Sequence, residues 1–269
     1  MAAERVGVVT GAGRGLGREV ARRLIDRGWT VVVTDIDEAA AKSTATGLGE
    51  RCHPMQHDVR DAVAHRAVAS YASSLGPVTA WVNNAGVLRT GTLWEQDDTT
   101  MTTTVDVNLL GVIHGTRAAL GLMRTHGKPA DIINMASMSA FGPLPGLAAY
   151  AASKAAVLSW TLTSAAELDA VGSLVRMHAV CPDGVRTDMV AENADNSGSA
   201  MIFSGKLLDP GTVADAITGL LGTNRVILSI PRHRAVAARI SGIAPRATLP
   251  LIRLAAELGE RNRRKDRAT

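Results

Sequence analysis

The sequence predicts a single α/β domain built on a doubly wound parallel sheet with helices on both faces. Three observations carry this prediction: short Val- and Ile-rich runs alternate with longer Ala-rich stretches of helical period, most of the short runs are apolar throughout, and a length of 269 residues suits one large domain. Continuous apolar strands are typical of a parallel sheet buried on both faces, whose strand–helix–strand units form right-handed crossovers.

The predicted strands and helices alternate along the chain. We expect strands at 5–10, 30–34, 51–57, 78–83, 130–136, 174–180 and 225–230. We expect helices at roughly 15–28, 37–48, 61–75, 102–126, 150–170 and 211–221. Residues 187–210 are polar, rich in small residues and weakly periodic, which predicts a long loop with at most a short helix, a feature typical of lids.

The composition is that of an ordinary globular protein, with 46% hydrophobic and 20% charged residues. Its two cysteines, Cys52 and Cys181, lie in predicted buried strands, so we expect no disulfide framework and a reducing, cytoplasmic location. The chain reaches a strand within a few residues of its start, without the apolar stretch and cleavage site of a secretory signal. No apolar run is long enough to cross a bilayer.

A glycine-rich turn separates the first predicted strand from the first predicted helix. Gly11 permits the tight turn, Gly15 lets the backbone approach a diphosphate, and Gly17 allows the helix to pack closely on the strand. The diphosphate would lie at the helix N-terminus beside Arg14 and Leu16, where free N–H groups and the helix dipole favour negative charge. A tight turn without a ligand has the same glycines, but the position between strand and helix favours a dinucleotide site.

The second predicted strand ends at Asp35, 24 positions beyond Gly11. A carboxylate here hydrogen-bonds the adenosine ribose hydroxyls and repels a 2′-phosphate, which favours NAD over NADP. Arg14 opposes this preference, because a basic residue in the glycine-rich turn can pair with a 2′-phosphate; we expect the repulsion to dominate. Asp35 could instead cap the next helix, although Asp37 can also fill that role.

Polar motifs also close the third and fourth predicted strands, namely His57-Asp58-Val59 and Asn83-Asn84-Ala85-Gly86. Either motif alone suits an ordinary turn. Doubly wound sheets bind ligands at the carboxyl ends of their strands. We therefore predict cofactor contacts from the residues Asp58, Val59, Asn84, Ala85 and Gly86.

Tyr150 and Lys154 are spaced by four residues, which places them on one face of a predicted helix. Hydride transfer between an alcohol carbon and a nicotinamide requires a proton to move at the oxygen, and a tyrosine hydroxyl can supply or accept it. A free phenol has a pKa of about 10, which the positive charge of Lys154 lowers toward working pH. Ser137 follows an apolar strand and could stabilise charge on the substrate oxygen. This Tyr–Lys spacing alone is common in helices.

Together these motifs resemble those of the short-chain dehydrogenase/reductase family, in the branch of roughly 250 residues. The matching elements are Thr10-Gly11-x-x-x-Gly15-x-Gly17, Asp58, Asn83-Asn84-Ala85-Gly86, Asn108, Ser137, Tyr150-x-x-x-Lys154 and Pro182-x-Gly184-Val185-x-Thr187. The resemblance spans residues 10–187 and implies a Rossmann-type sheet of seven mostly parallel strands, a nicotinamide cofactor and a single catalytic domain.

The resemblance also implies roles for individual residues. Lys154 would hold the nicotinamide ribose beside Tyr150, and Asn108 would position a water that links Lys154 to solvent. The Val185 backbone would meet the nicotinamide carboxamide, and Thr187 would touch the diphosphate or cap the next segment. The family spacing selects Ser137 rather than Ser139. Asp183 stands where many relatives have Gly, which affects local geometry.

We therefore expect an NAD-dependent alcohol dehydrogenase or ketone reductase in which Tyr150 is the acid/base. The segments 88–96, 138–147 and 187–210 would enclose the substrate, and the apolar 138–147 favours an apolar secondary alcohol or ketone. Two alternatives remain: an NADP-dependent carbonyl reductase of the same family, and a catalytically idle nucleotide-sensing or scaffold protein. The histidines show no metal-ligand spacing, so no metal is predicted. By resemblance we expect a homodimer or homotetramer.

We divide the chain into a catalytic domain, 1–230, and a basic, partly helical C-terminal extension, 231–269. Eleven Lys and Arg but three Asp and Glu fall between Arg225 and Thr269, although the whole chain carries a net charge of +4. Apolar stretches alternate with arginines here, which suits weak docking on an anionic membrane surface or packing on a neighbouring subunit. Pro245 and Pro250 would divide the segment into two short helices. The tail has no aromatic residue to stack bases, so nucleic-acid binding is not expected.

Overall fold

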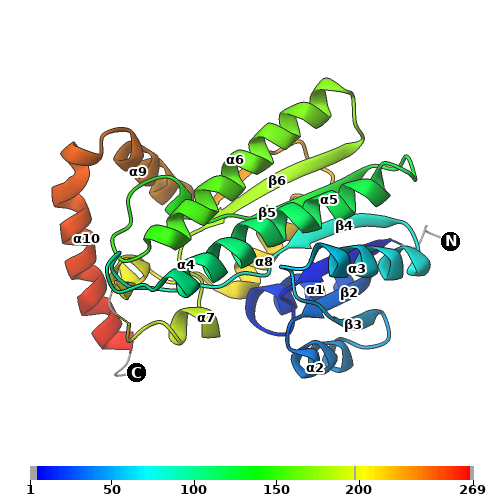
Figure 1. The fold of residues 1–269 in the computed structure, drawn as a ribbon, viewed down its shortest axis with the longest axis horizontal. Helices are drawn as coiled ribbons and strands as arrows, with labels where there is room; N and C mark the ends of the chain where they lie inside the picture. The colour runs from blue at the N-terminus through cyan, green and yellow to red at the C-terminus, as the bar shows by residue number, and fades with distance from the viewer. Residues whose placement is uncertain (1–4, 197, 267–269) are drawn as a thin grey trace.

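The computed structural model describes residues 5–196 and 198–266, with side chains as far as residue 263, and is built on a seven-stranded parallel sheet (Figure 1). The strands are β1 (Val6–Thr10), β2 (Thr30–Asp35), β3 (Cys52–Gln56), β4 (Val78–Asn83), β5 (Ala130–Met135), β6 (Val175–Pro182) and β7 (Ile227–Ile230). Their order is β3-β2-β1-β4-β5-β6-β7, so the chain reverses its direction across the sheet between β1 and β4. The predicted doubly wound fold is confirmed, and such a reversal is where these sheets bind ligands.

Helices cover both faces of the sheet because successive strand residues point to opposite sides. Val9 and Val33 pack toward α1 (Gly15–Asp26), α2 (Glu38–Leu48) and α8 (Pro210–Thr218). Val8 and Val32, their chain neighbours, pack toward α3 (Ala62–Leu75), α5 (Gly111–Met123) and α6 (Ala148–Ala170). All four valines are fully buried, which explains why the strands read as continuous apolar runs.

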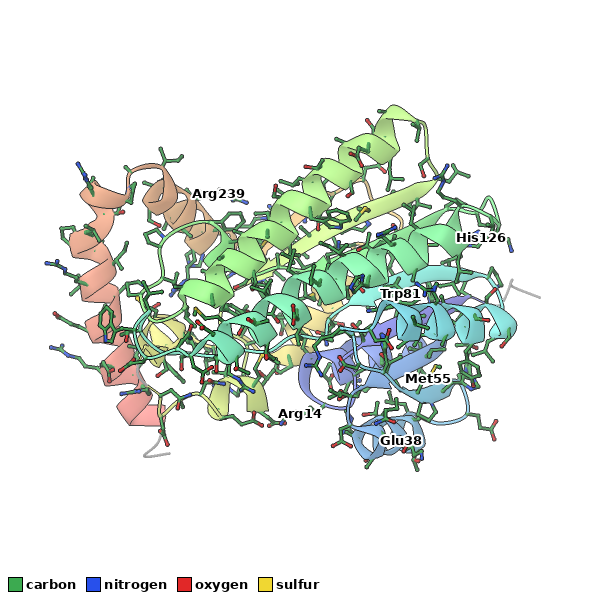
Figure 2. The ribbon with its side chains drawn as sticks, in the orientation of Figure 1. Arg14, Glu38, Met55, Trp81, His126 and Arg239 are labelled. Atoms are coloured by element: carbon green, nitrogen blue, oxygen red, sulfur yellow. The ribbon has the colours of Figure 1, made fainter. Side chains whose placement is uncertain are left out.

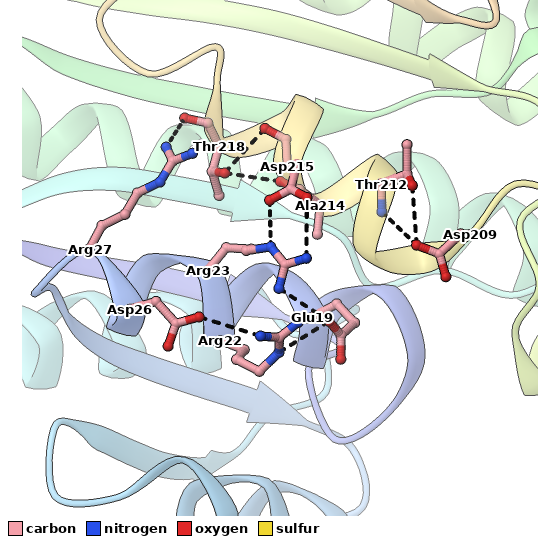
Figure 3. A network of polar contacts seen from close by, with 10 residues as sticks. All are labelled: Glu19, Arg22, Arg23, Asp26, Arg27, Asp209, Thr212, Ala214, Asp215 and Thr218. Atoms are coloured by element: carbon pink, nitrogen blue, oxygen red, sulfur yellow. Dashed lines mark hydrogen bonds and ion pairs between the residues drawn. The ribbon is translucent and has the colours of Figure 1, made fainter.

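Side chains at the C-terminal end of α1 form polar contacts with α8 (Figure 3). The Arg23 guanidinium pairs with the Asp215 carboxylate, and Arg27 Nη1 donates to the carbonyl of Thr218 at 2.7 Å. The arginines at the end of α1 therefore stabilise the packing between segments far apart in the sequence.

The helix predicted over 102–126 is continuous from Asp98 to Met123, but it contains a π-helical turn that the sequence did not predict. The chain forms α4 (Asp98–Val105), a π-helical turn (Asp106–Leu110) and α5. α4 begins early because Asp97 Oδ1 accepts a hydrogen bond from the amide of Thr100 and caps it. The wider turn contains Asn108, whose buried side chain bonds the backbone of Val87; π-turns inside helices often mark functional sites.

The loop predicted over 187–210 contains α7 (Asp188–Ala191) and a 3-10 turn (Ser199–Phe203). After β7 the chain forms α9 (Arg232–Ile243) and α10 (Pro245–Asp266). The break predicted at Pro250 is wrong, since Pro250 lies inside α10. Near a helix start a proline removes one backbone hydrogen bond, here to the carbonyl of Arg246, and the helix continues. Among the described residues, no helix is both long and apolar enough to span a membrane.

Candidate active site

A cavity of about 700 Å³ follows the carboxyl edge of the sheet, from the glycine-rich turn after β1 to the helices α9 and α10. It is lined by nearly all of the predicted site residues: Gly11, Arg14, Gly15, Leu16, Gly17, Asp35, Asp58, Val59, Asn84, Ala85, Gly86, Ser137, Tyr150, Lys154, Val185 and Thr187. Asn108 stands behind this wall, bonded to the Val87 backbone. The parallel strands and the start of α6 thus bring residues from seven separate segments to one cavity.

The glycine-rich turn fits a dinucleotide diphosphate. Gly11 adopts φ +61°, and a Cβ there would lie 2.6 Å from Ala85 Cα. A Cβ at Gly17 would collide with the carbonyl oxygen of Gly11. No side chain caps α1, and its first turn holds no acidic residue, so its N-terminal N–H groups are left for an anion.

Asp35 lines the cavity beside the glycine-rich turn, and its carboxylate faces that turn. Its Oδ2 accepts from the amide of Gly13 at 2.9 Å, and its Oδ1 accepts from the amide of Asp37 at 3.1 Å. Asp37 is the residue that caps α2, through the amide of Ala40. The capping alternative for Asp35 is therefore wrong.

Arg14 extends from the same turn toward α7, and is labelled in Figure 2. Its Nη1 lies 2.5 Å from Glu192 Oε1 and 3.7 Å from Asp188 Oδ2. The hydrogen bond to Glu192 is the main reason that the pKa of Arg14 lies above its usual value. Two carboxylates from the α7 segment thus surround the guanidinium that would attract a 2′-phosphate.

Thr10 was not predicted as a site residue. It stabilises the point between β1 and β4 where the chain reverses its direction across the sheet. Its Oγ1 accepts hydrogen bonds from the amides of Asn84 and Ala85, both at 3.1 Å. Asn84 Nδ2 donates in turn to the carbonyl of Gly11 at 2.9 Å. Asn83 points into the core instead, where Trp81 Nε1 donates to its Oδ1 at 2.8 Å. Of the two asparagines, Asn84 therefore stabilises the cavity wall and Asn83 stabilises the core.

Tyr150 and Lys154 lie in the first turns of α6, and Ser137 follows β5. Burial raises the pKa of Tyr150, and a hydrogen bond with the Ser137 hydroxyl lowers it by less. Lys154 is only 4% exposed; its Nζ donates to the carbonyl of Met135 at 2.7 Å, and burial lowers its pKa to about 8. The ammonium lies 5.9 Å from the centre of the Tyr150 ring. The hydroxyls of Ser137 and Tyr150, which together could bind a substrate oxygen, therefore lie beside the ammonium of Lys154, whose pKa is about 8.

Beyond these hydroxyls the cavity wall is mostly apolar. The predicted segments contribute Leu88, Met138, Leu144, Leu147, Met189, Val190, Met201 and Ile202. Of 88–96, only Leu88 lines the cavity, and Trp94 is 84% exposed. The part of the wall that α9 and α10 form was not predicted from the sequence. Its residues are Arg234, Ala237, Ala238, Ser241, Thr248, Leu251, Ile252 and Ala255. The many arginines of this region suggested an exposed surface. Its small residues recur at helical spacing, and this pattern could have predicted a face that packs on the rest of the chain.

Asp183, the departure from the family pattern, has a partner in that part of the wall. Arg234 Nε lies 2.6 Å from Asp183 Oδ2, and Arg234 Nη2 donates to Ser204 Oγ at 2.8 Å. Burial raises the pKa of Asp183, and the charge of Arg234 counters this effect. The acid therefore ties the end of β6 to α9 across the cavity.

Comparisons with known proteins agree with this geometry. A family model described as short chain dehydrogenase matches residues 5–198. The oxidoreductase EphD of Mycobacterium tuberculosis is 34% identical over 263 residues, which cover 91% of this chain and 44% of that protein. The chain thus spans less than half the length of that relative.

Two solved structures share the fold. A short-chain dehydrogenase/reductase from Burkholderia phymatum in complex with NAD has a TM-score of 0.83 and 28% identity, covering 93% of this chain and 95% of that one. A variant of actinorhodin polyketide ketoreductase with NADPH has a TM-score of 0.75 and 29% identity, covering 84% of this chain and 95% of that one. The neighbours therefore include holders of both nicotinamide cofactors.

Proposed function

We propose that this chain, which belongs to the short-chain dehydrogenase/reductase family, transfers a hydride between NAD(H) and an apolar secondary alcohol or ketone. One observation carries the proposal: Ser137, Tyr150 and Lys154 line the same cavity as the glycine-rich turn and Asp35. Family membership makes the chain a nucleotide-dependent oxidoreductase; the cofactor choice and the substrate class are our inference.

The cofactor would be held along the carboxyl edge of the sheet and, when bound, supplies or accepts the hydride. The uncapped start of α1 would bind its diphosphate, and Asp35 would bind the adenosine ribose. Asn84 keeps its side chain on the Gly11 carbonyl and so fixes the shape of the turn.

The chemistry at the substrate oxygen falls to the two hydroxyls. Ser137 donates a hydrogen bond to the oxygen and stabilises the charge that develops on it. Tyr150 takes the proton of an alcohol, or gives one to a ketone. Burial alone favours the neutral phenol, so protonated Lys154 has to offset that effect by stabilising the phenolate. The Met135 carbonyl holds the ammonium in place for this task.

The environment of Arg14 supports NAD over NADP. Asp35 would face a 2′-phosphate with like charge, and Arg14 is already neutralised by Glu192 and Asp188. An NADP-dependent carbonyl reductase remains the second candidate, because the same guanidinium could be released toward a phosphate and one structural neighbour holds NADPH.

The cavity wall supports an apolar substrate. Leucine, isoleucine, methionine and alanine side chains enclose the space beyond Ser137, and the charges there, Asp183 and Arg234, satisfy each other. A free carboxylate or a sugar would leave polar groups unpaired against this wall.

The test is a panel of apolar secondary alcohols and matching ketones, each assayed with NAD(H) and NADP(H) through nicotinamide absorbance. We expect turnover with NAD(H) and higher kcat/KM for apolar than for charged members of the panel. Tight NADH binding without turnover of any member would favour the scaffold alternative. Equal kcat/KM for both cofactors would contradict the NAD assignment.

A further inference from the structure

The helix pair α9–α10 is anchored on the body of the same chain at both ends. At α9, Gly242 packs so closely on the Phe141 carbonyl that a Cβ would collide. Arg239, labelled in Figure 2, stacks over the Phe141 ring at 4.1 Å. At α10, Asn262 Nδ2 donates to the Phe203 carbonyl at 3.0 Å, and Arg263 Nη1 donates to the Ala194 carbonyl at 2.9 Å. The inward face of each helix is therefore already packed against the rest of the chain.

A second apolar face of the pair is largely exposed in the part of the chain that the structure describes. On α9 it consists of Val236, Ile240 and Ile243, and on α10 of Leu251, Leu254 and Leu258, with exposed fractions between 44% and 85%. Spacings of three and four residues place each triplet on one side of its helix. We call these six residues the apolar stripe. Figure 1 shows α10 at one extreme end of the molecule, where a flat surface can reach it.

Arginines accompany the apolar stripe. Arg246 and Arg253 lie seven residues apart, hence on one side of α10, about a third of a turn around the helix from the apolar stripe, and both are exposed. Within residues 5–196 and 198–263, neither forms an ion pair. Their charges are therefore available to an external anionic group.

The apolar stripe continues into the active-site cavity. Leu251 lines that cavity and is nevertheless 64% exposed, so it lies at the opening. Its neighbour Ile252 lines the interior and is buried. An apolar path thus runs from the outer surface of α10 to the space beyond Ser137.

We propose that the apolar stripe and its arginines dock on an anionic lipid surface, with the opening of the cavity toward that surface. Apolar side chains inserted at headgroup depth, flanked by arginines on lipid phosphates, are how amphipathic helices lie on membranes. A second copy of the chain suits this face less well, because a two-fold contact brings the same patch together and sets arginines against arginines. The binding itself does not depend on which reaction the cavity supports.

The experiment is co-sedimentation of the full chain with vesicles of phosphatidylcholine alone and of phosphatidylcholine mixed with phosphatidylglycerol. We expect the wild type to pellet with the mixed vesicles at low salt, and to stay in the supernatant with pure phosphatidylcholine. Ile243→Ser/Leu254→Ser/Leu258→Ser should lower the bound fraction about tenfold. The matched control, Val63→Ser/Val171→Ser/Leu174→Ser, alters three exposed apolar side chains elsewhere and should bind as the wild type does.

Arg246→Gln/Arg253→Gln provides an independent arm that leaves the apolar stripe intact. This variant should lose binding to the mixed vesicles, and wild-type binding should fall as salt increases. The proposal is overturned if the wild type stays in the supernatant with mixed vesicles at low salt, or if both variants bind like the control. It is also overturned if sedimentation velocity shows that the serine variant dissociates an oligomer and vesicles bind neither protein, since a second copy then covers the stripe.

Discussion

Arg234 in α9 holds Asp183 at the end of β6 with its Nε 2.6 Å from the Asp183 carboxylate. The two residues lie 51 positions apart in the sequence, and both line the cavity. Asp183 directly precedes Gly184 and Val185, where the family places the nicotinamide carboxamide. The contact therefore connects the end of β6 to the cavity wall that α9 forms.

Breaking this contact should weaken substrate binding more than cofactor binding. We expect Asp183→Asn and Arg234→Met each to raise KM for an apolar substrate about tenfold, because either leaves an unpaired polar group in a partly buried site. The NADH dissociation constant should change by less than about threefold. The double variant should raise KM no more than either single variant does, because each substitution removes the same interaction. Fully additive losses would mean that the two residues act separately.

Cofactor preference should depend on Asp35 first and on the pairing of Arg14 second. Asp35→Ala removes the repulsion and should raise kcat/KM with NADP. Adding Glu192→Gln frees the Arg14 guanidinium and should raise it further. Asp26→Asn, which breaks an exposed pair with Arg22 at the C-terminal end of α1, is the matched control and should leave the preference unchanged. If Glu192→Gln has no effect in the Asp35→Ala background, Arg14 does not reach the phosphate.

The strands, the glycine-rich turn and the residues that line the cavity around Tyr150 were predictable because each depends on a local pattern. Apolar runs mark the strands, glycine spacing marks the turn, and one helical turn relates Tyr150 to Lys154. The contacts that complete the site are long-range: Arg14 and Glu192 are 178 residues apart, and no local rule connects them. The π-turn around Asn108 also escaped prediction, because no local pattern marks it and Asn108 bonds the backbone of Val87, 21 residues earlier in the chain.

The C-terminal wall shows why composition can mislead. Its arginines and apolar stretches indicated an extension that docks on a membrane or on a neighbouring subunit, yet the buried Ile252 and the close contact at Gly259 belong to a face packed on the same chain. One helix carries both faces, and only the fold determines which residues turn inward.

Two buried histidines should make stability depend on pH. Burial lowers the pKa of both His57 and His65 to about 4, well below the value near 6.5 in an unfolded chain. As pH falls from about 6.5 toward 4, the unfolded chain binds protons that the folded chain does not, so the free energy of unfolding decreases. Each unit of pKa difference corresponds to about 1.4 kcal/mol.

The measurement is the urea midpoint at pH 7.5, 6.5, 5.5 and 4.5. We expect a steady fall below about pH 6.5, with a shallower slope in His65→Gln. Equal slopes in the wild type and His65→Gln would contradict the assignment to buried histidines.

The most direct test of the proposed chemistry is single-turnover hydride transfer in Tyr150→Phe, with the NADH dissociation constant measured on the same protein. The chain has only two tyrosines, so Tyr71→Phe, remote from the cavity, is the natural control. We predict a loss of roughly 10²–10⁴-fold in the Tyr150→Phe rate, NADH binding within about threefold of wild type, and no change in Tyr71→Phe. A Tyr150→Phe rate above about a tenth of the wild-type value would contradict Tyr150 as the proton carrier.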